Sequence, residues 1–176
     1  MDVFWNKSFG TTTMQDLADA TGVLRGSLYN AYRDKETIFL LAYKRHIANF
    51  MREIQAALEH PEADRALRDF FGVAIKSITT GEPTRGCLTT KTATDANANS
   101  VVIREALRAF LDDLEHAVQI RLEVEEARTR LTLPPADAAR LVVTLLRGII
   151  VMERVYADPK RLKKTADSLI KILFSV

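Results

Sequence analysis

The sequence predicts an all-α protein, with an N-terminal three-helix helix-turn-helix domain and a larger C-terminal helical domain. Alanine and leucine, which lose least on entering a helix, occur 22 and 20 times, whereas glycine and proline, which lose most, occur 7 and 5 times. Apolar residues recur at spacings of three and four through most of the chain. A length of 176 residues excludes a large multidomain enzyme and a repeat array. We place the two domains at residues 1–45 and 46–176.

A short helix is expected to begin after Thr13 and to end at Gly22. Thr13 is followed three residues later by Asp16, a spacing typical of a capping box, in which side chains and backbone N–H groups satisfy each other. Gly22 can adopt the left-handed conformation that ends a helix. A longer helix is expected to begin at Lys35, with Asp34 as its N-terminal cap.

Between these helices, residues 23–32 can form a second short helix. Its inward side would carry Val23, Leu28 and Tyr32. Two short helices joined by a glycine-containing turn are the helix-turn-helix arrangement, whose second helix fits the major groove of duplex DNA. The outward residues, which we expect to contact DNA, are Arg25, Gly26, Ser27, Tyr29 and Asn30.

These outward residues have the chemistry that base edges and phosphates require. Arginine can bind a guanine edge through two hydrogen bonds, the hydroxyl groups of Ser27 and Tyr29 can hold phosphates or pyrimidine edges, and glycine allows close approach. Helix starts also present free N–H groups to phosphate. Residues at helix starts are more often caps than ligands, so both interpretations stay open. The candidate phosphate contacts at helix starts are Thr11, Thr12, Thr13 and Lys35.

The C-terminal domain is predicted from apolar stripes that each mark one helix. The stripes cover residues 47–58, 67–78 and 103–118, and prolines mark breaks in the chain, one of them at Glu82-Pro83. Helices of this kind can enclose a ligand cavity, although aromatic stripes more often simply fill the core. The residues expected to line the cavity are Phe50, Ile54, Phe70, Phe71, Leu88, Phe110 and Leu114.

The last two predicted helices are apolar around much of their circumference. Residues 141–151 contain Arg147 as their one charged residue, and a second apolar segment follows at 162–174. A helix that is apolar on two faces must be covered on two sides, and in a chain this short a second copy is expected to supply the cover. The predicted homodimer interface consists of Leu141, Leu145, Ile149, Met152, Leu162, Leu169 and Leu173.

The single cysteine, Cys87, is a candidate redox sensor. It is expected near the start of a helix with Arg85 and Lys91 close by, where the helix dipole and positive charge favour the thiolate. An inert core thiol is the alternative, because free cysteine is among the residues most often buried. One cysteine and three scattered histidines do not have the spacing of a metal site, and no cofactor is expected.

A resemblance to a known family covers about forty residues of the N-terminal part. It is carried by three runs: Phe4 to Val23, Gly26-Ser27-Leu28-Tyr29-Asn30 and Asp34-Lys35-Glu36-Thr37-Ile38-Phe39. Together they resemble the DNA-binding domain of the TetR/AcrR family of bacterial transcriptional regulators. The resemblance implies a homodimeric, all-helical repressor with paired helix-turn-helix heads. It also implies that the last two helices pair across a two-fold axis and that the interior binds an inducer.

Some positions depart from the family pattern. The family usually has a basic arm before the position of Phe4, whereas this sequence begins at Met1, so a form extended upstream is expected to bind its operator more tightly. Leu24 stands where a capping serine is usual, and Ala31 stands where a histidine is common. We expect the weaker cap at Leu24 to cost about 1 kcal/mol.

The sequence therefore predicts a ligand-responsive, DNA-binding transcriptional regulator, most simply a dimeric repressor that a small-molecule inducer releases from a palindromic operator in double-stranded DNA. The alternative is a helical dimeric ligand-binding or interaction module whose truncated head no longer binds DNA. With a net charge of +2, binding to DNA must come from a local patch. Binding that weakens steeply with added salt would favour the regulator.

An enzyme is not expected, because the sequence shows no phosphate-cradling glycine loop, no nucleophile elbow and no Cys/His pair at meaningful spacing. The chain shows no run of eighteen apolar residues and no secretory signal. We therefore expect no membrane partner and a cytoplasmic location.

Overall fold

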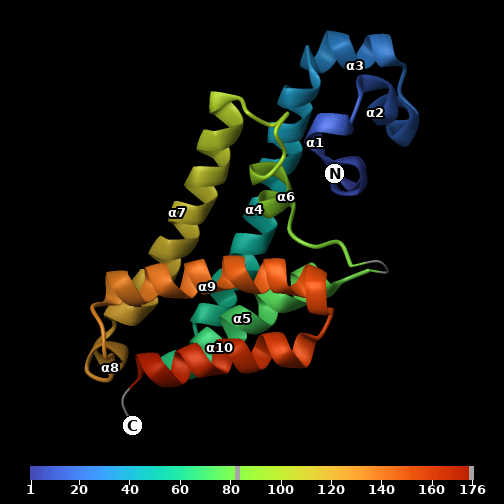
Figure 1. Cartoon of the computed structure of the whole chain (residues 1–176). Helices are drawn as coiled ribbons and strands as arrows, with labels where there is room; N and C mark the ends of the chain where they lie inside the picture. The colour runs from blue at the N-terminus through green and yellow to red at the C-terminus, as the bar shows by residue number, and fades with distance from the viewer. Residues whose placement is uncertain (82–83, 175–176) are drawn as a thin grey trace. The chain divides into compact units, whose positions relative to one another are not determined.

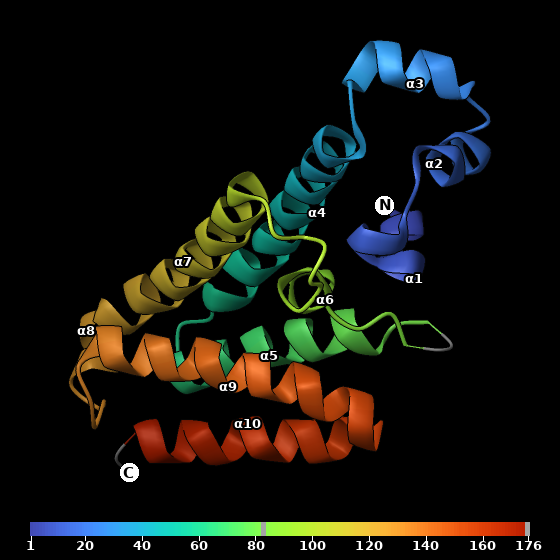
Figure 2. The ribbon, with the colours of Figure 1, turned by 45° about the horizontal axis from the view of Figure 1, so that its top comes forward.

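The computed structural model describes residues 1–81 and 84–174, so the break expected at Glu82-Pro83 lies outside the described residues. The described residues form ten α-helices, shown from two directions in Figure 1 and Figure 2, and their one β-type pairing is an isolated bridge between Leu131 and Phe174. The all-α fold class is confirmed. The helices are α1 (Asp2–Thr11), α2 (Met14–Thr21), α3 (Arg25–Tyr32), α4 (Lys35–Leu58), α5 (Ala63–Thr79), α6 (Leu88–Ala93), α7 (Val101–Glu123), α8 (Glu125–Arg128), α9 (Pro135–Tyr156) and α10 (Pro159–Leu173).

Contacts divide the chain into two compact units. The N-terminal unit comprises residues 1–49 and 88–109, and the C-terminal unit comprises residues 50–87 and 110–176. The helix-turn-helix thus shares its unit with α6 and the first part of α7, which lie far from it in sequence. The domain boundary after residue 45 stays a prediction.

The caps predicted in the N-terminal unit are present. The Asp16 backbone N–H donates to Thr13 Oγ1 at 3.1 Å, and Asp16 Oδ2 accepts from the Thr13 backbone N–H at 2.8 Å, which confirms the capping box. Hydrogen bonds from the Lys7 ammonium and from Thr13 lower the pKa of Asp16 to about 2, so the carboxylate stays charged at neutral pH. Gly22 ends α2 with φ 67°, and Asp34 Oδ1 accepts from a backbone N–H in the first turn of α4.

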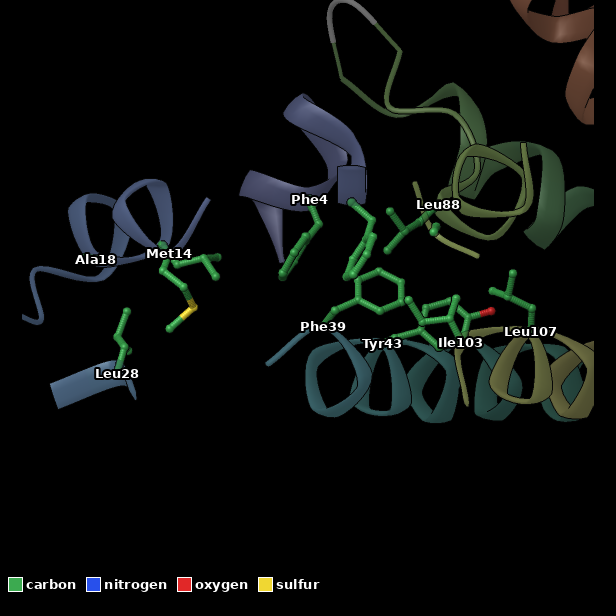
Figure 3. Packing of buried hydrophobic residues seen from close by; sticks show 12 residues of the cluster. Phe4, Met14, Ala18, Leu28, Phe39, Tyr43, Leu88, Ile103 and Leu107 are labelled. Atoms are coloured by element: carbon green, nitrogen blue, oxygen red, sulfur yellow. The ribbon is translucent and has the colours of Figure 1, made fainter. Parts of the chain in front are cut away.

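Aromatic rings from α1 and α4 form the core of the N-terminal unit (Figure 3). Phe39 is fully buried, and the centroid of its ring lies 5.2 Å from that of Phe4 and 5.2 Å from that of Phe9. Leu88, the first residue of α6, is buried in the same cluster with Leu107 from α7. Leu88 was expected to line a ligand cavity, but the short helix that it begins packs against α1, which places its side chain in this core.

The end of α1 is held tightly by the segment that follows α6. The Gly10 backbone N–H donates to Asp95 Oδ2 at 2.6 Å, and a Cβ atom at Gly10 would lie 2.8 Å from Asn97 Cβ. Burial would raise the pKa of Asp95, but hydrogen bonds from Gly10 and from Asn97 outweigh it and lower this pKa. The close approach therefore requires glycine at position 10, and the hydrogen bonds favour the charged form of the Asp95 carboxyl.

In the C-terminal unit, α5, α9 and α10 pack against one another in pairs, and Figures 1 and 2 both show α9 and α10 side by side. The turn before α5 is held by the buried Arg121, whose Nη2 donates to His60 O at 2.9 Å and to Pro61 O at 2.7 Å. Glu126 accepts from both Arg121 and the Ala63 backbone N–H. None of the helices in the described ranges is long and apolar enough to cross a membrane.

Candidate DNA-binding surface

The helix α3 presents most of its side chains to solvent. Leu28 is buried, whereas the predicted contacts Arg25, Gly26, Ser27, Tyr29 and Asn30 are all exposed. Val23 and Tyr32, which we expected to face inward, are exposed as well. That expectation was wrong because α3 is only eight residues long and contacts the core with Leu28 at its centre, so residues at its two ends lie beyond the core.

Arg25 and Tyr29 lie one turn apart on α3 and contact each other. The Arg25 Cζ atom lies 5.5 Å from the centroid of the Tyr29 ring, and Arg25 Nη2 donates to the Tyr29 hydroxyl at a long 3.5 Å. Arginine has five N–H donors in a planar fork, so this contact orients the side chain and leaves most donors for a base edge or a phosphate.

The backbone of α3 is accessible near its start. No atom lies within 4 Å of the position that a Cβ would take at Gly26. Leu24, for which the structure shows no side-chain cap, is 80% exposed beside Arg25. Sequence reasoning treated Leu24 only as a poor cap, but an apolar side chain at this place can contact the methyl group of a thymine.

The three threonines before α2 differ in what they can offer to phosphate. Thr11 is exposed, and Thr13 is exposed but engaged in the capping box. Thr12 is buried, and its Oγ1 donates to Ser8 O at 2.5 Å. The kink of α1 at Ser8, where φ is 66°, is stabilised by this hydrogen bond, so the phosphate contact expected of the Thr12 side chain is replaced by a structural role.

Lys35 also has a structural role in place of the expected phosphate contact. Its Nζ donates to the backbone carbonyls of Phe9, Gly10 and Thr12 at 2.9, 3.1 and 2.9 Å. The ammonium group lies 4.6 Å from the centroid of the Phe9 ring. A lysine has three N–H donors, and three carbonyls at the end of α1 take all of them. The side chain therefore caps α1, as basic groups do at helix C-termini.

The residues predicted to line a ligand cavity are mostly buried. Ile54, Phe70, Phe71 and Leu114 are buried in the C-terminal unit, and the rings of Phe70 and Phe71 meet at 5.3 Å. Phe50 is partly exposed, and its ring lies 6.0 Å from that of Phe110. A hollow in the described structure lies along the exposed side of α10, and its lining residues are Asp158, Lys160, Arg161, Lys164, Thr165 and Ser168.

Cys87 is partly exposed, and Arg147 of α9 lies beside it. Arg147 Nη1 donates to Cys87 Sγ at 3.8 Å, and its Cζ lies 5.9 Å from the centroid of the Phe110 ring. Lys91, one of the bases expected near the thiol, donates instead to the backbone carbonyl of Trp5. Sequence reasoning missed the role of Arg147, although a lone charge in the apolar stretch 141–151 was a visible signal.

The residues predicted to form a dimer interface fall into two groups. Leu141 and Met152 are exposed, and Leu145 and Leu169 are partly exposed. The other three already pack within the C-terminal unit: they are Ile149, Leu162 and Leu173. The same exposed side of α9 carries apolar residues that were not predicted, Val151 and Val155.

Comparison with known families decides what kind of protein carries this surface. The family model described as "Tetracyclin repressor-like, C-terminal domain" matches residues 63–169, and the one described as "Bacterial regulatory proteins, tetR family" matches residues 1–42. The chain belongs to the TetR family.

Relatives of this TetR-family chain match it along nearly its whole length. The HTH-type transcriptional repressor ComR of Escherichia coli (strain K12) is 25% identical over 177 residues, which cover 98% of this chain and 84% of ComR. The crystal structure of the reduced form of E. coli NemR matches with a TM-score of 0.86 and 17% identity, over 99% of this chain and 92% of NemR.

A cysteine mutant of the TetR family regulator CifR, complexed with 26bp double-strand operator DNA, matches with a TM-score of 0.85 and 22% identity. The match covers 97% of this chain and 91% of CifR.

Membership of the TetR family confirms that the chain is a DNA-binding transcriptional regulator and excludes the alternative of an enzyme. It also confirms the fold of an N-terminal helix-turn-helix followed by a helical C-terminal domain. The individual contact residues stay predictions. In the described part of the chain, no group of three or more His, Cys, Asp or Glu residues could hold a metal ion.

Proposed function

We propose that the chain is a dimeric repressor that binds a palindromic operator through two copies of α3 and leaves the operator when its C-terminal domain responds to a small molecule. The observation that carries the proposal is the outward face of α3, on which Arg25 and Tyr29 lie one turn apart with Leu28 buried behind them. A protein that acts on chromosomal DNA in a bacterium works in the cytoplasm.

The proposed dimer surface is narrower than the sequence analysis expected. Three predicted residues are already buried within the subunit, so the surface consists of exposed or partly exposed residues on adjoining sides of α9 and α10. Exposed apolar residues gathered along one side of a helix are typical of interaction sites. A two-fold axis that pairs this surface with itself would present two heads to DNA. Its residues are Leu141, Leu145, Val151, Met152, Val155, Leu169 and Ile172.

Two recognition helices can enter successive major grooves only if they lie about 34 Å apart. A ligand that binds better to a dimer with a different spacing shifts the population away from the DNA-binding form. A solved structure shows a cysteine mutant of CifR complexed with operator DNA, and ComR is named a repressor. Both support repression through operator binding as the function of this chain.

Arg25→Ala is expected to weaken operator binding about 5-fold to 150-fold, which corresponds to the 1–3 kcal/mol of a lost base or phosphate contact. Fluorescence anisotropy with a duplex from the region upstream of the protein's own gene would measure this, over a range of salt concentrations. The affinity of the wild-type protein should fall steeply with salt.

The matched control is Arg45→Ala, which removes the same charge from an exposed position on α4 and should change the affinity less than twofold. Equal affinity of the Arg25→Ala variant and the wild-type protein would contradict the proposed contact. If the wild-type protein shows no salt-dependent binding to the duplex, the helical module that does not bind DNA is favoured.

Cys87 is the residue that we propose as a sensor of electrophiles. Cys87 is partly exposed, and the Arg147 guanidinium lies beside its sulfur. Cys87→Ser should leave operator affinity unchanged and should abolish the release of operator that a mild electrophile causes. Unchanged release in the same anisotropy assay would assign Cys87 to the inert alternative.

A further inference from the structure

Among the residues that the structure describes, Arg147 has no carboxylate partner. Within the described ranges its guanidinium forms no ion pair, its hydrogen bond is the one from Nη1 to Cys87 Sγ, and its Nε is buried without a hydrogen-bond partner. A guanidinium group has N–H donors and no acceptor, so only a group that accepts hydrogen bonds can match it. A buried donor without a partner is costly, so a group that accepts a hydrogen bond from Arg147 Nε would be bound favourably.

The buried acid of the same helix does not fill this role. Glu153 is only 2% exposed, and its Oε1 accepts from Thr84 Oγ1 at 2.7 Å, while its Oε2 has no hydrogen-bond partner. Arg147 and Glu153 are six residues apart on α9, a rise of about 9 Å, so each points to a different turn of the helix. The two side chains therefore form no contact with each other that could satisfy Arg147 within the described part of the C-terminal unit.

The group that suits a guanidinium edge is a carboxylate, because the planar fork of arginine matches the two oxygens of a carboxylate. The edge that includes Nε has no protein partner, whereas Nη1 points to the sulfur of Cys87. The Phe110 ring lies 5.9 Å from Arg147 Cζ and offers apolar surface next to the charge. A carboxylate bound on the free edge would therefore hold the rest of a small molecule within reach of the thiol.

We propose that Arg147 binds the carboxylate of a small electrophile and holds its reactive carbon beside Cys87 Sγ, so that the protein selects carboxylate-bearing electrophiles over neutral ones. The inference rests on the proposed function of Cys87 as the sensing thiol. Arg147 is then the residue that sets specificity, and Cys87 is the residue that reacts.

The reaction of iodoacetate shows the step with atoms and electrons balanced. The thiol proton goes to solvent, the Sγ–carbon bond forms with the electron pair of the thiolate, and the carbon–iodine bond breaks as iodide leaves with its electron pair. Iodoacetamide reacts in the same way but carries a neutral amide in place of the carboxylate. The two reagents thus differ in the group that Arg147 would recognise.

The experiment compares the rates at which iodoacetate and iodoacetamide alkylate the full chain, followed by intact-mass spectrometry. Because the chain has one cysteine, the adduct that a Cys87→Ser variant fails to form under the same conditions reports Cys87 alone. The quantity compared is the rate with iodoacetate divided by the rate with iodoacetamide. A change in the reactivity of the thiol itself affects both rates equally and cancels in this ratio. The ratio for the wild-type protein should exceed that for Arg147→Gln, and that for N-acetylcysteine, at least tenfold.

The matched control is Arg140→Gln, which removes an exposed arginine from the same helix and should keep the wild-type ratio. A second measurement needs no variant: propanoate should slow the reaction of wild-type protein with iodoacetamide, and propanamide should not. A wild-type ratio equal to that of Arg147→Gln or of N-acetylcysteine would overturn the proposal. So would equal effects of propanoate and propanamide, or no reaction with either reagent.

The outcome is separable from the function proposed for Cys87. Operator affinity of the alkylated protein is measured in a separate assay. A carboxylate preference with unchanged operator binding would retain the recognition role of Arg147 and reject Cys87 as the switch. Release of operator without a carboxylate preference would retain Cys87 as the switch and reject the recognition role of Arg147.

Discussion

Lys35→Met is expected to lower the free energy of unfolding of the N-terminal unit by about 3 kcal/mol. The ammonium group donates to three backbone carbonyls at the end of α1, and methionine, which has similar length, offers no donor to any of them. Urea unfolding followed by tryptophan fluorescence would measure the change. Trp5 is the one tryptophan of the chain and its ring lies 4.7 Å from that of His46, so its emission reports the N-terminal unit.

The control is Lys44→Met, which removes an exposed lysine from the same helix. It should change the free energy of unfolding by no more than about 0.5 kcal/mol. Operator binding is measured below the unfolding transition, at several salt concentrations. If the Lys35→Met protein keeps its stability but loses affinity and part of its salt dependence, then Lys35 binds phosphate and the structural role is rejected.

Lys35 illustrates why part of the surface could not be predicted from sequence. The capping box at Thr13 and the left-handed Gly22 follow from residues within one helical turn, so the pattern of the sequence contains them. The carbonyls that Lys35 binds lie more than twenty positions earlier in the chain. Nothing local distinguishes a lysine that caps a distant helix from one that meets phosphate, because both stand at a helix start.

The apolar stripes show the same limit in the C-terminal unit. Periodicity correctly predicted helices and their buried faces, and α5 buries the predicted Phe70 and Phe71. It did not reveal which core each helix joins, so Leu88 was placed in a cavity although it packs under the helix-turn-helix. It also did not separate inward from outward residues on α9, because residues 141–151 of this helix are apolar around most of its circumference. Ile149 was therefore predicted to be at the interface, and it is buried within the subunit.

Val151→Asp is expected to convert the proposed dimer into monomers and to weaken operator binding at least about 100-fold, because two half-sites bound by a linked pair are held far more tightly than by single heads. Val151 is 51% exposed on α9, so the substitution leaves the packing within the subunit intact, and helical circular dichroism should not change. In a two-fold interface each copy would bring one new carboxylate, and burying two like charges without partners is strongly unfavourable.

Sizing chromatography with light scattering measures the mass of the particle, and the same protein is then tested for operator binding. The matched control is Ile120→Asp, because Ile120 is an apolar residue of α7 with a 52% exposed side chain outside the proposed surface. This variant should keep the mass and the operator affinity of the wild-type protein. A Val151→Asp protein that remains a dimer would move the interface away from α9. Loss of the dimer in both variants would show that a new charge outside the proposed surface also breaks the dimer. That result would contradict the assignment of the interface to α9 and α10.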